Sequence, residues 1–199
     1  SWLGPFVVSP YLLADLTVLR SGGWPSHLIL LGGVGNCAYH RWAGPEMIEI
    51  FVDGDGCPVK DETYVVATRY GVPVALVANS RLGVPEGFGV EMVLVEQGPD
   101  AADDWIVENV RPGDVVVTGD IPLAARCLEA GARVLGTNGR IFTEDSIGNL
   151  LATRDLKAHL RETGVMSRGP APMSKKERSR FLSKLDELVQ LGLREHRPG

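Results

Sequence analysis

The chain has few of the residues and segments on which several common classes of protein depend. It contains only three cysteines among 199 residues, and none of them forms a CxxC pair, so neither a disulfide framework nor a zinc site is predicted. The longest apolar run, at 28–35, is interrupted by glycine and falls short of the roughly 18 residues of a membrane span. No basic segment precedes an apolar core near the start, as a secretory signal requires. We therefore expect a cytoplasmic protein without a membrane span.

Histidine is also scarce, which limits the kinds of catalysis to be expected. Two of the four histidines, His27 and His40, lie near the start of the chain, and the other two, His159 and His196, lie near its end. Neither a Ser-His-Asp arrangement nor a cysteine paired with histidine is therefore indicated. The glycine-containing stretches GGVGNC and TNGR do not match a complete P-loop.

The first 46 residues differ in composition from the rest. They carry only four charged residues but three of the four tryptophans, and no helical or strand period persists in them. A strong apolar run follows directly after Met47. We predict that residues 1–46 are a poorly ordered N-terminal extension and that residues 47–199 form the functional domain.

Within 47–199, short apolar runs alternate with amphipathic segments. Runs rich in β-branched residues predict strands at 48–52, 73–78, 90–95, 114–118 and 132–135. Apolar residues at three- and four-residue spacing predict helices at 59–70, 101–110 and 122–130. This alternation is typical of an α/β fold with a mainly parallel sheet covered on both faces. We expect a three-layer α/β/α sandwich with five strands, followed from about residue 145 by C-terminal helices at 145–162 and 174–191.

Aspartates gather where the predicted strands end and helices begin. Asp53 and Asp55 follow the first predicted strand, and Asp120 follows the fourth. Ligands of open parallel sheets bind at the carboxyl ends of the strands, where the strand order reverses, so these carboxylates converge if the two strands flank that point. Three further acids stand at the start of the 101–110 helix, and one of them would complete the cluster: Asp100, Asp103 and Asp104.

A cluster of this kind predicts a divalent metal, because neighbouring carboxylates repel one another unless a hard cation compensates them. The purely structural alternatives stay open for each acid. Asp100 and Asp120 are suited to capping helices, and the helix dipole alone favours acids in a first turn. Asp53 and Asp55 alternate with glycines and would also fit a tight turn.

Acidic and basic residues are segregated along the chain. Residues 151–199 carry eleven Lys or Arg against six Asp or Glu, although the whole chain has a net charge of −5. A basic tail beside an acidic site suits a polyanion whose phosphates it neutralises, and the alternative is a solvated basic helix. The candidate phosphate contacts are Arg140, Arg154, Lys175, Lys176 and Arg178.

Several motifs together resemble one bacterial family. The stretches VDGDGCPVK, DAADDWI, GDVVVTGDIPLAARCLEAGA, LATRDLKAHLR and ERSRFL are similar to those of the YaiI/YqxD family, from about Met47 to Leu191. Gly54 and Gly56 replace alanines of its usual first motif. The resemblance implies a PIN-like fold, the architecture of metal-dependent nucleases, with an acidic cluster that binds Mg²⁺ or Mn²⁺.

Carried over onto this chain, the family motifs match its acids position by position. The first aspartate of PIN-like proteins matches Asp53, the acid at the helix start matches Asp100, Asp103 or Asp104, and the acid of the T-x-D motif matches Asp120. The resulting hypothesis is a metal-dependent nuclease-like protein that acts on RNA or another phosphodiester, with Asp53, Asp55 and Asp120 as catalytic residues. Two alternatives remain. One is a haloacid-dehalogenase-like phosphohydrolase, which DGDG after a strand resembles, and the other is a non-catalytic RNA- or protein-binding module.

Overall fold

The computed structural model describes residues 47–55, 57–85, 89–96, 98, 100–162 and 173–196. The predicted N-terminal extension at 1–46 lies outside these described residues, so the expectation that it is poorly ordered stays a prediction. In the described part of the chain, no helix combines the length and apolar character needed to cross a membrane.

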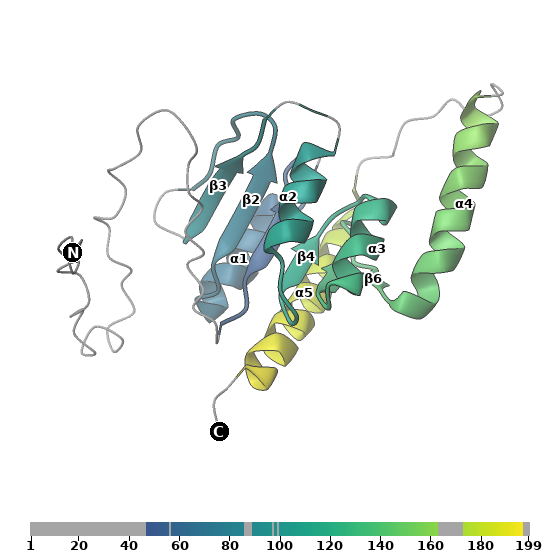
Figure 1. Ribbon diagram of the computed structural model, residues 1–199. Helices are drawn as coiled ribbons and strands as arrows, with labels where there is room; N and C mark the ends of the chain where they lie inside the picture. Colours follow the sequence, from purple (N-terminus) through teal and green to yellow (C-terminus); the bar gives the residue numbers. More distant parts are fainter. Residues whose placement is uncertain are drawn as a thin grey trace, which may run out of the picture. The chain divides into compact units, whose positions relative to one another are not determined.

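A single sheet of six strands organises this part of the chain (Figure 1). Its strand order is β3-β2-β1-β4-β5-β6, with β1 to β5 parallel and β6 antiparallel to β5. The strands are β1 (Ile50–Asp53), β2 (Val74–Ala78), β3 (Val90–Leu94), β4 (Val115–Val117), β5 (Arg133–Leu135) and β6 (Ile141–Phe142). The five predicted strands are confirmed. The predicted number was one too low, because β6 has only two residues and shows no period in the sequence.

In the described part of the chain five helices accompany the sheet, and all five were predicted to within a few residues. They are α1 (Lys60–Tyr70), α2 (Ala101–Asn109), α3 (Ile121–Glu129), α4 (Glu144–Glu162) and α5 (Lys175–Glu195). Helix α5 begins with a capping box in which Ser174 and Glu177 satisfy each other's backbone N–H groups. It extends past the predicted end at 191, and its residue Leu193 still packs against the core.

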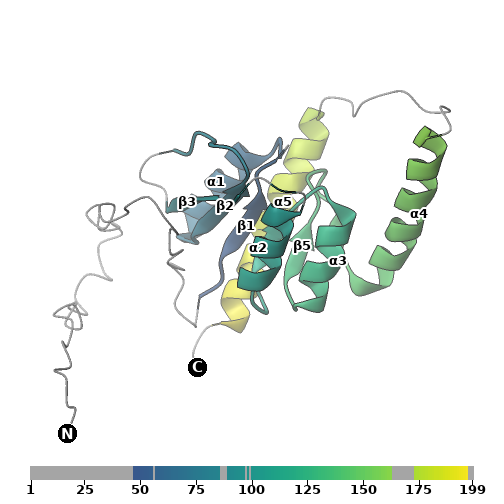
Figure 2. The same ribbon diagram turned by 45° about the horizontal axis from the view of Figure 1, so that its top comes forward.

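The helices cover both faces of the sheet, which gives three layers (Figures 1 and 2). Ile50 and Val52 of β1 point to the face covered by α1 and α5, whereas Phe51 between them packs with residues of α2 and α3. This alternation follows from the two-residue period of a strand. The strands read as continuous apolar runs because both of their sides are buried. The predicted α/β/α sandwich is confirmed.

The strand order places a reversal point at the centre of the sheet. Strand β1 pairs with β2 on one side and with β4 on the other. From β1 the chain adds β2 and β3 on one side, and it then returns to add β4, β5 and β6 on the other side. The carboxyl ends of β1 and β4 therefore flank the crevice in which ligands of such sheets bind. Helix α5 begins at the same edge, where Arg178 contacts the carbonyl oxygen of Pro58, and it ends at the opposite edge beside Ile48.

Candidate functional site

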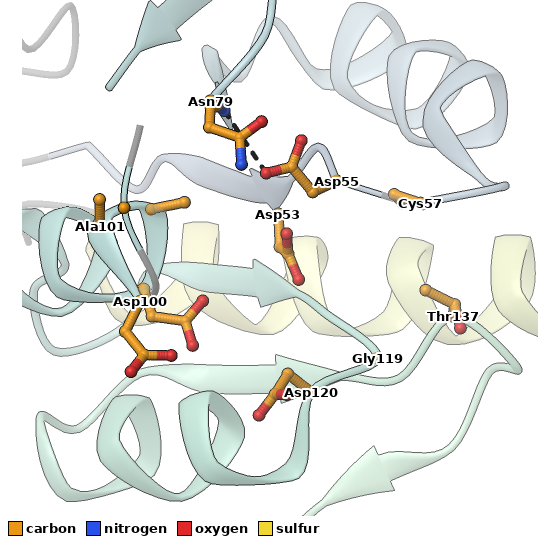
Figure 3. A pocket seen from close by; sticks show the side chains of 12 residues that line it. Asp53, Asp55, Cys57, Asn79, Asp100, Ala101, Gly119, Asp120 and Thr137 are labelled. Atoms are coloured by element: carbon orange, nitrogen blue, oxygen red, sulfur yellow. Dashed lines mark hydrogen bonds between the residues drawn. The ribbon is translucent and has the colours of Figure 1, made fainter. Parts of the chain in front are cut away.

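A pocket with a volume of about 480 Å³ opens where β1 and β4 end (Figure 3). Its lining includes five carboxylates, which come from the end of β1 and the loop after it, the start of α2 and the N-cap of α3 after β4: Asp53, Asp55, Asp100, Asp103 and Asp120. Uncharged residues complete the wall, among them Cys57, Asn79 and Thr137. No lysine, arginine or histidine belongs to the described lining. The crevice predicted from the strand order therefore exists, and it is strongly acidic.

Asp53 is the last residue of β1 and is half-buried in this pocket. Burial raises the pKa of the Asp53 carboxyl, and the charges of Asp55 and Asp120 add to the increase. A hydrogen bond from Thr118 opposes it, since Thr118 Oγ1 donates to Asp53 Oδ2 at 2.9 Å. Thr118 is itself fully buried, so this contact fixes the orientation of the Asp53 carboxylate.

Asp120 combines the two roles that the sequence left as alternatives. Its Oδ1 accepts a hydrogen bond from the backbone N–H of Leu123 at 3.2 Å and thereby caps α3. Its Oδ2 lies 3.7 Å from Nη2 of Arg154 on α4. The backbone N–H of Asp120 donates to Thr118 Oγ1 at 2.9 Å, so one threonine links the acids at the ends of β1 and β4. Capping leaves one carboxylate oxygen of Asp120 available to the pocket.

Asp100 precedes α2 but does not cap it with its side chain. Its φ of 63° places it in the left-handed region, and its carboxylate makes no capping hydrogen bond. Asp100 thus occupies the N-cap position of α2, but the expected capping by its side chain is absent. Aspartate tolerates this backbone conformation better than most residues, at a cost of roughly 1–3 kcal/mol. The carboxylate lines the pocket instead.

Asp103 and Asp104 are neighbours in the sequence, but only one of them belongs to the pocket. Asp103 lines it, and its pKa is raised to about 6 by burial and then by the charges of Asp120, Asp53 and Asp100. Asp104 is exposed and forms an ion pair with Arg126, whose Nη2 lies 2.6 Å from Asp104 Oδ1. Of the three acids that could complete the cluster of carboxylates, only Asp100 and Asp103 thus lie in the pocket.

Three uncharged lining residues follow strands in the same way as the acids. Asn79 comes directly after β2, and its backbone N–H lies 3.4 Å from Asp55 Oδ2 (Figure 3). Thr137 follows β5 by two residues. Neither residue was predicted from the sequence, although both fit the rule that strand ends line the crevice. Burial raises the pKa of the third residue, Cys57, to about 11, so its thiol stays protonated at neutral pH.

The acids share one pocket without forming a ready-made ligand shell. Among the described residues, no three Asp, Glu, His or Cys side chains are arranged so that they would by themselves hold a metal ion. Their charges nevertheless reach one another, because Asp120, Asp53 and Asp100 all raise the pKa of Asp103. The pocket therefore concentrates negative charge over a space wider than one coordination sphere.

The predicted phosphate contacts lie outside the lining and differ in their surroundings. Arg140, Lys175 and Lys176 are exposed, and Arg154 stands beside Asp120 at the pocket. Arg178 is engaged elsewhere: it forms an ion pair with Glu62 of α1, and its Nη1 lies 3.3 Å from the carbonyl oxygen of Pro58. Arg178 therefore joins α5 to α1 and to the loop after β1.

Comparisons with known proteins find relatives over most of the described part of the chain. The family model described as "Uncharacterized BCR, YaiI/YqxD family" matches residues 51–191, a segment that includes every lining residue. A UPF0178 protein of Paramagnetospirillum magneticum is 54% identical over 143 residues, which cover 72% of this chain and 95% of that protein. A UPF0178 protein of Brucella ovis is 57% identical over 143 residues, covering 71% and 89%. No solved structure matches the chain.

Proposed function

The chain belongs to the YaiI/YqxD family, and from this membership and its acidic pocket we propose that it is a metal-dependent phosphodiesterase of the nuclease type. RNA or another phosphodiester would be its substrate. The observation that carries the proposal is the convergence of five carboxylates at the point where the strand order reverses. Mutual repulsion of this kind disfavours the unliganded site, and a bound cation would relieve it.

The donor set suits Mg²⁺ or Mn²⁺ better than a softer metal. Carboxylate oxygens are the ligands that these hard cations prefer, and Mg²⁺ commonly binds through one or two carboxylates while water and substrate phosphates complete its shell. This mode of binding agrees with an acidic pocket in which no three described side chains form a closed ligand group. Asp53 and Asp120, with Asp100 or Asp103, would hold the metal. Asp104 is not among these ligands, because it pairs with Arg126.

The residues around the metal ligands have distinct tasks in this proposal. When bound, the metal would activate water and neutralise charge on the phosphate. Thr118 holds the Asp53 carboxylate in place through its hydrogen bond. Asp55 is exposed at the pocket and would orient the attacking water. Arg154 stands beside Asp120 with an exposed side chain, so it is placed to contact a phosphate that enters there.

Two other functions receive less support from the pocket. In haloacid-dehalogenase-like chemistry Asp53 would attack phosphorus, but that chemistry uses a lysine, and the described lining contains none. A binding module without catalysis would bind metal or RNA without turnover. Measuring hydrolysis alongside metal binding distinguishes this outcome.

Hydrolysis of a small chromogenic phosphodiester, bis(p-nitrophenyl) phosphate, and of labelled single-stranded RNA tests the proposal in the presence of Mn²⁺. We expect Asp53→Asn and Asp120→Asn to lower both rates by about 100-fold or more, since each removes a charge that would hold the metal. Asn at position 120 can still cap α3, which preserves the fold. Asp104→Asn is the matched control and should keep the wild-type rate.

Equal rates in all four proteins would overturn the proposal. Metal binding by the wild type without hydrolysis of either substrate would instead favour the binding module.

A further inference from the structure

The described lining of the pocket has no basic residue, so the cations that would accompany a longer polyanion must lie beyond its rim. They are unevenly distributed around it. On the α2 side the exposed charged groups near the carboxyl edge are Glu96, Asp100 and Asp104, and the last of these already pairs with Arg126. On the β2–β3 connection, Arg81 is the one cation among the described residues. A phosphate chain leaving over α2 would therefore meet mainly like charge.

The turn between β5 and β6 connects the pocket to the opposite side. Thr137 lines the pocket, and Arg140 closes the same turn. The turn is fixed by its own hydrogen bonds, since the N–H of Gly136 donates to the carbonyl of Arg140 at 2.7 Å and the N–H of Gly139 donates to that of Gly136 at 2.8 Å. Arg140 is thus held next to the pocket on a short and well-defined turn.

This turn packs directly against the beginning of α5. Gly139 has a φ of 76°, and a Cβ atom added to it would lie 2.8 Å from the backbone nitrogen of Phe181 and 3.0 Å from Arg180. The first turns of α5 are therefore the immediate neighbours of the β5–β6 turn. The turn therefore extends from the pocket wall, at Thr137, to the first turns of α5, against which Gly139 packs.

The start of α5 is basic, although Glu177 lies among its first residues and feels the charge of Arg180. Lys175, Lys176 and Arg180 are exposed there, and the N-terminal end of a helix carries partial positive charge of its own. Arg178 is the exception, because Glu62 and the Pro58 carbonyl occupy its guanidinium. Lys184, two turns further on, is paired with Glu187.

We propose that a single-stranded nucleic acid leaves the pocket across the β5–β6 turn and runs over the first turns of α5, where Arg140, Lys175, Lys176 and Arg180 contact its phosphates. Arg178 is a positioning residue in this arrangement, since it holds the start of α5 against the loop that carries Asp55. The inference rests on the proposed function, and it adds the path of the strand and the division of labour among the basic residues.

Binding of a fluorescently labelled oligouridylate to the full chain, measured by anisotropy in EDTA over a series of salt concentrations, tests this path. Asp53→Asn serves as the parent so that no cleavage interferes. Adding Lys175→Ala and Lys176→Ala should make the slope of log K against log salt less negative by about 1.4, because each phosphate contact contributes roughly −0.7 for single strands. The same relation gives a loss of affinity of about 25-fold at roughly 0.1 M salt.

Lys184→Ala is the matched control, since it removes one lysine from the same helix outside the proposed path. We expect it to change the affinity less than about twofold, as befits a side chain already paired on the surface. Unchanged affinity and slope in the double variant, or no binding by the parent at low salt, would overturn the proposed path. The proposed path would also be overturned if Lys184→Ala lost as much affinity as the double variant loses for each of its two lysines.

The failure of this inference can be told apart from the failure of the proposed function. Hydrolysis of bis(p-nitrophenyl) phosphate by the wild type needs the pocket but no extended strand. If that diester is cleaved while the affinity for RNA does not change when Lys175 and Lys176 are replaced, the path is wrong and the phosphodiesterase proposal stands. If RNA binds along the path and the diester is not cleaved, the path stands and the phosphodiesterase proposal is wrong.

Discussion

Asp103 and Asp104 illustrate how strongly the position of a single residue on a helix decides its chemistry. Successive residues of a helix point about 100° apart, so two adjacent acids in the first turn of α2 face different surroundings. Asp103 points into the acidic pocket, where its pKa rises to about 6, and Asp104 points to Arg126. The helix dipole favours acids at both positions, which explains why the sequence alone did not separate them.

The raised pKa of Asp103 predicts a dependence of stability on pH. Because the folded state binds this proton more tightly than the unfolded chain, whose aspartate has its ordinary pKa of 3.8, the ionised carboxyl opposes folding above about pH 6. Asp103→Asn should therefore raise the free energy of unfolding in EDTA by about 1 kcal/mol at about pH 7.5, a value discounted for screening by solvent. The gain should fade as the pH falls from about 6 to 3.8.

Urea denaturation at several pH values measures this effect. Asp104→Asn is the control and should show no such gain, because it removes a surface ion pair instead of a repelled charge. A pH-independent difference between Asp103→Asn and the wild type would contradict the interpretation.

At the scale of elements, the β5–β6 turn packs closely against α5. The turn fits against the helix only because residue 139 has no Cβ and adopts a positive φ. Arg178 adds a second connection, from α5 to α1 and the loop after β1. Residues more than a hundred positions apart in the sequence thus set the shape of the pocket rim.

Gly139→Ala is expected to destabilise the protein by about 2 kcal/mol or more, because the new methyl group meets the backbone of α5 and the left-handed conformation becomes strained. Gly148→Ala offers a control within α4, where nothing lies within 4 Å of the added Cβ. That substitution should stabilise the helix by about 0.5–1 kcal/mol. Thermal or urea unfolding of both variants measures the difference, and equal effects would refute the close approach of turn and helix.

At the scale of the whole molecule, the segregation of charge along the chain becomes a separation in space. The acids converge at the centre of the carboxyl edge, and exposed basic residues stand on the side of β5, β6 and α5. Metal binding should consequently be visible in the stability of the entire domain, since a ligand of the folded state adds to the free energy of unfolding.

Mn²⁺ at about one hundred times its dissociation constant should stabilise the wild type by about 2.7 kcal/mol, which corresponds to an increase in Tm of roughly 5–10 °C. Asp53→Asn should lose this increase, whereas Asp104→Asn should retain it, because Asp104 lies outside the lining. Differential scanning fluorimetry with and without Mn²⁺ measures the shifts. An equal increase in both variants would show that the cation binds elsewhere.

The sequence by itself determined the order and type of the main elements and the gathering of acids at the strand ends. Buried parallel strands require uninterrupted β-branched runs, and helices that cover them require a 3.6-residue period, so both leave a local signal. Asp53 and Asp120 were found for the same reason, as acids at or just past the ends of such runs. Strand β6 left no signal because two residues cannot display a period.

Only the tertiary structure decided which residues share the pocket. The left-handed turn at Asp100, the separation of Asp103 from Asp104 and the partnership of Arg178 with Glu62 all depend on side-chain directions and on contacts between distant segments. Thr137 and Asn79 join the lining because the strand order brings their strands beside β4 and β1. Their positions after strands mark them as candidates, but which strands are neighbours, and which side chains meet, is decided by packing across the sheet.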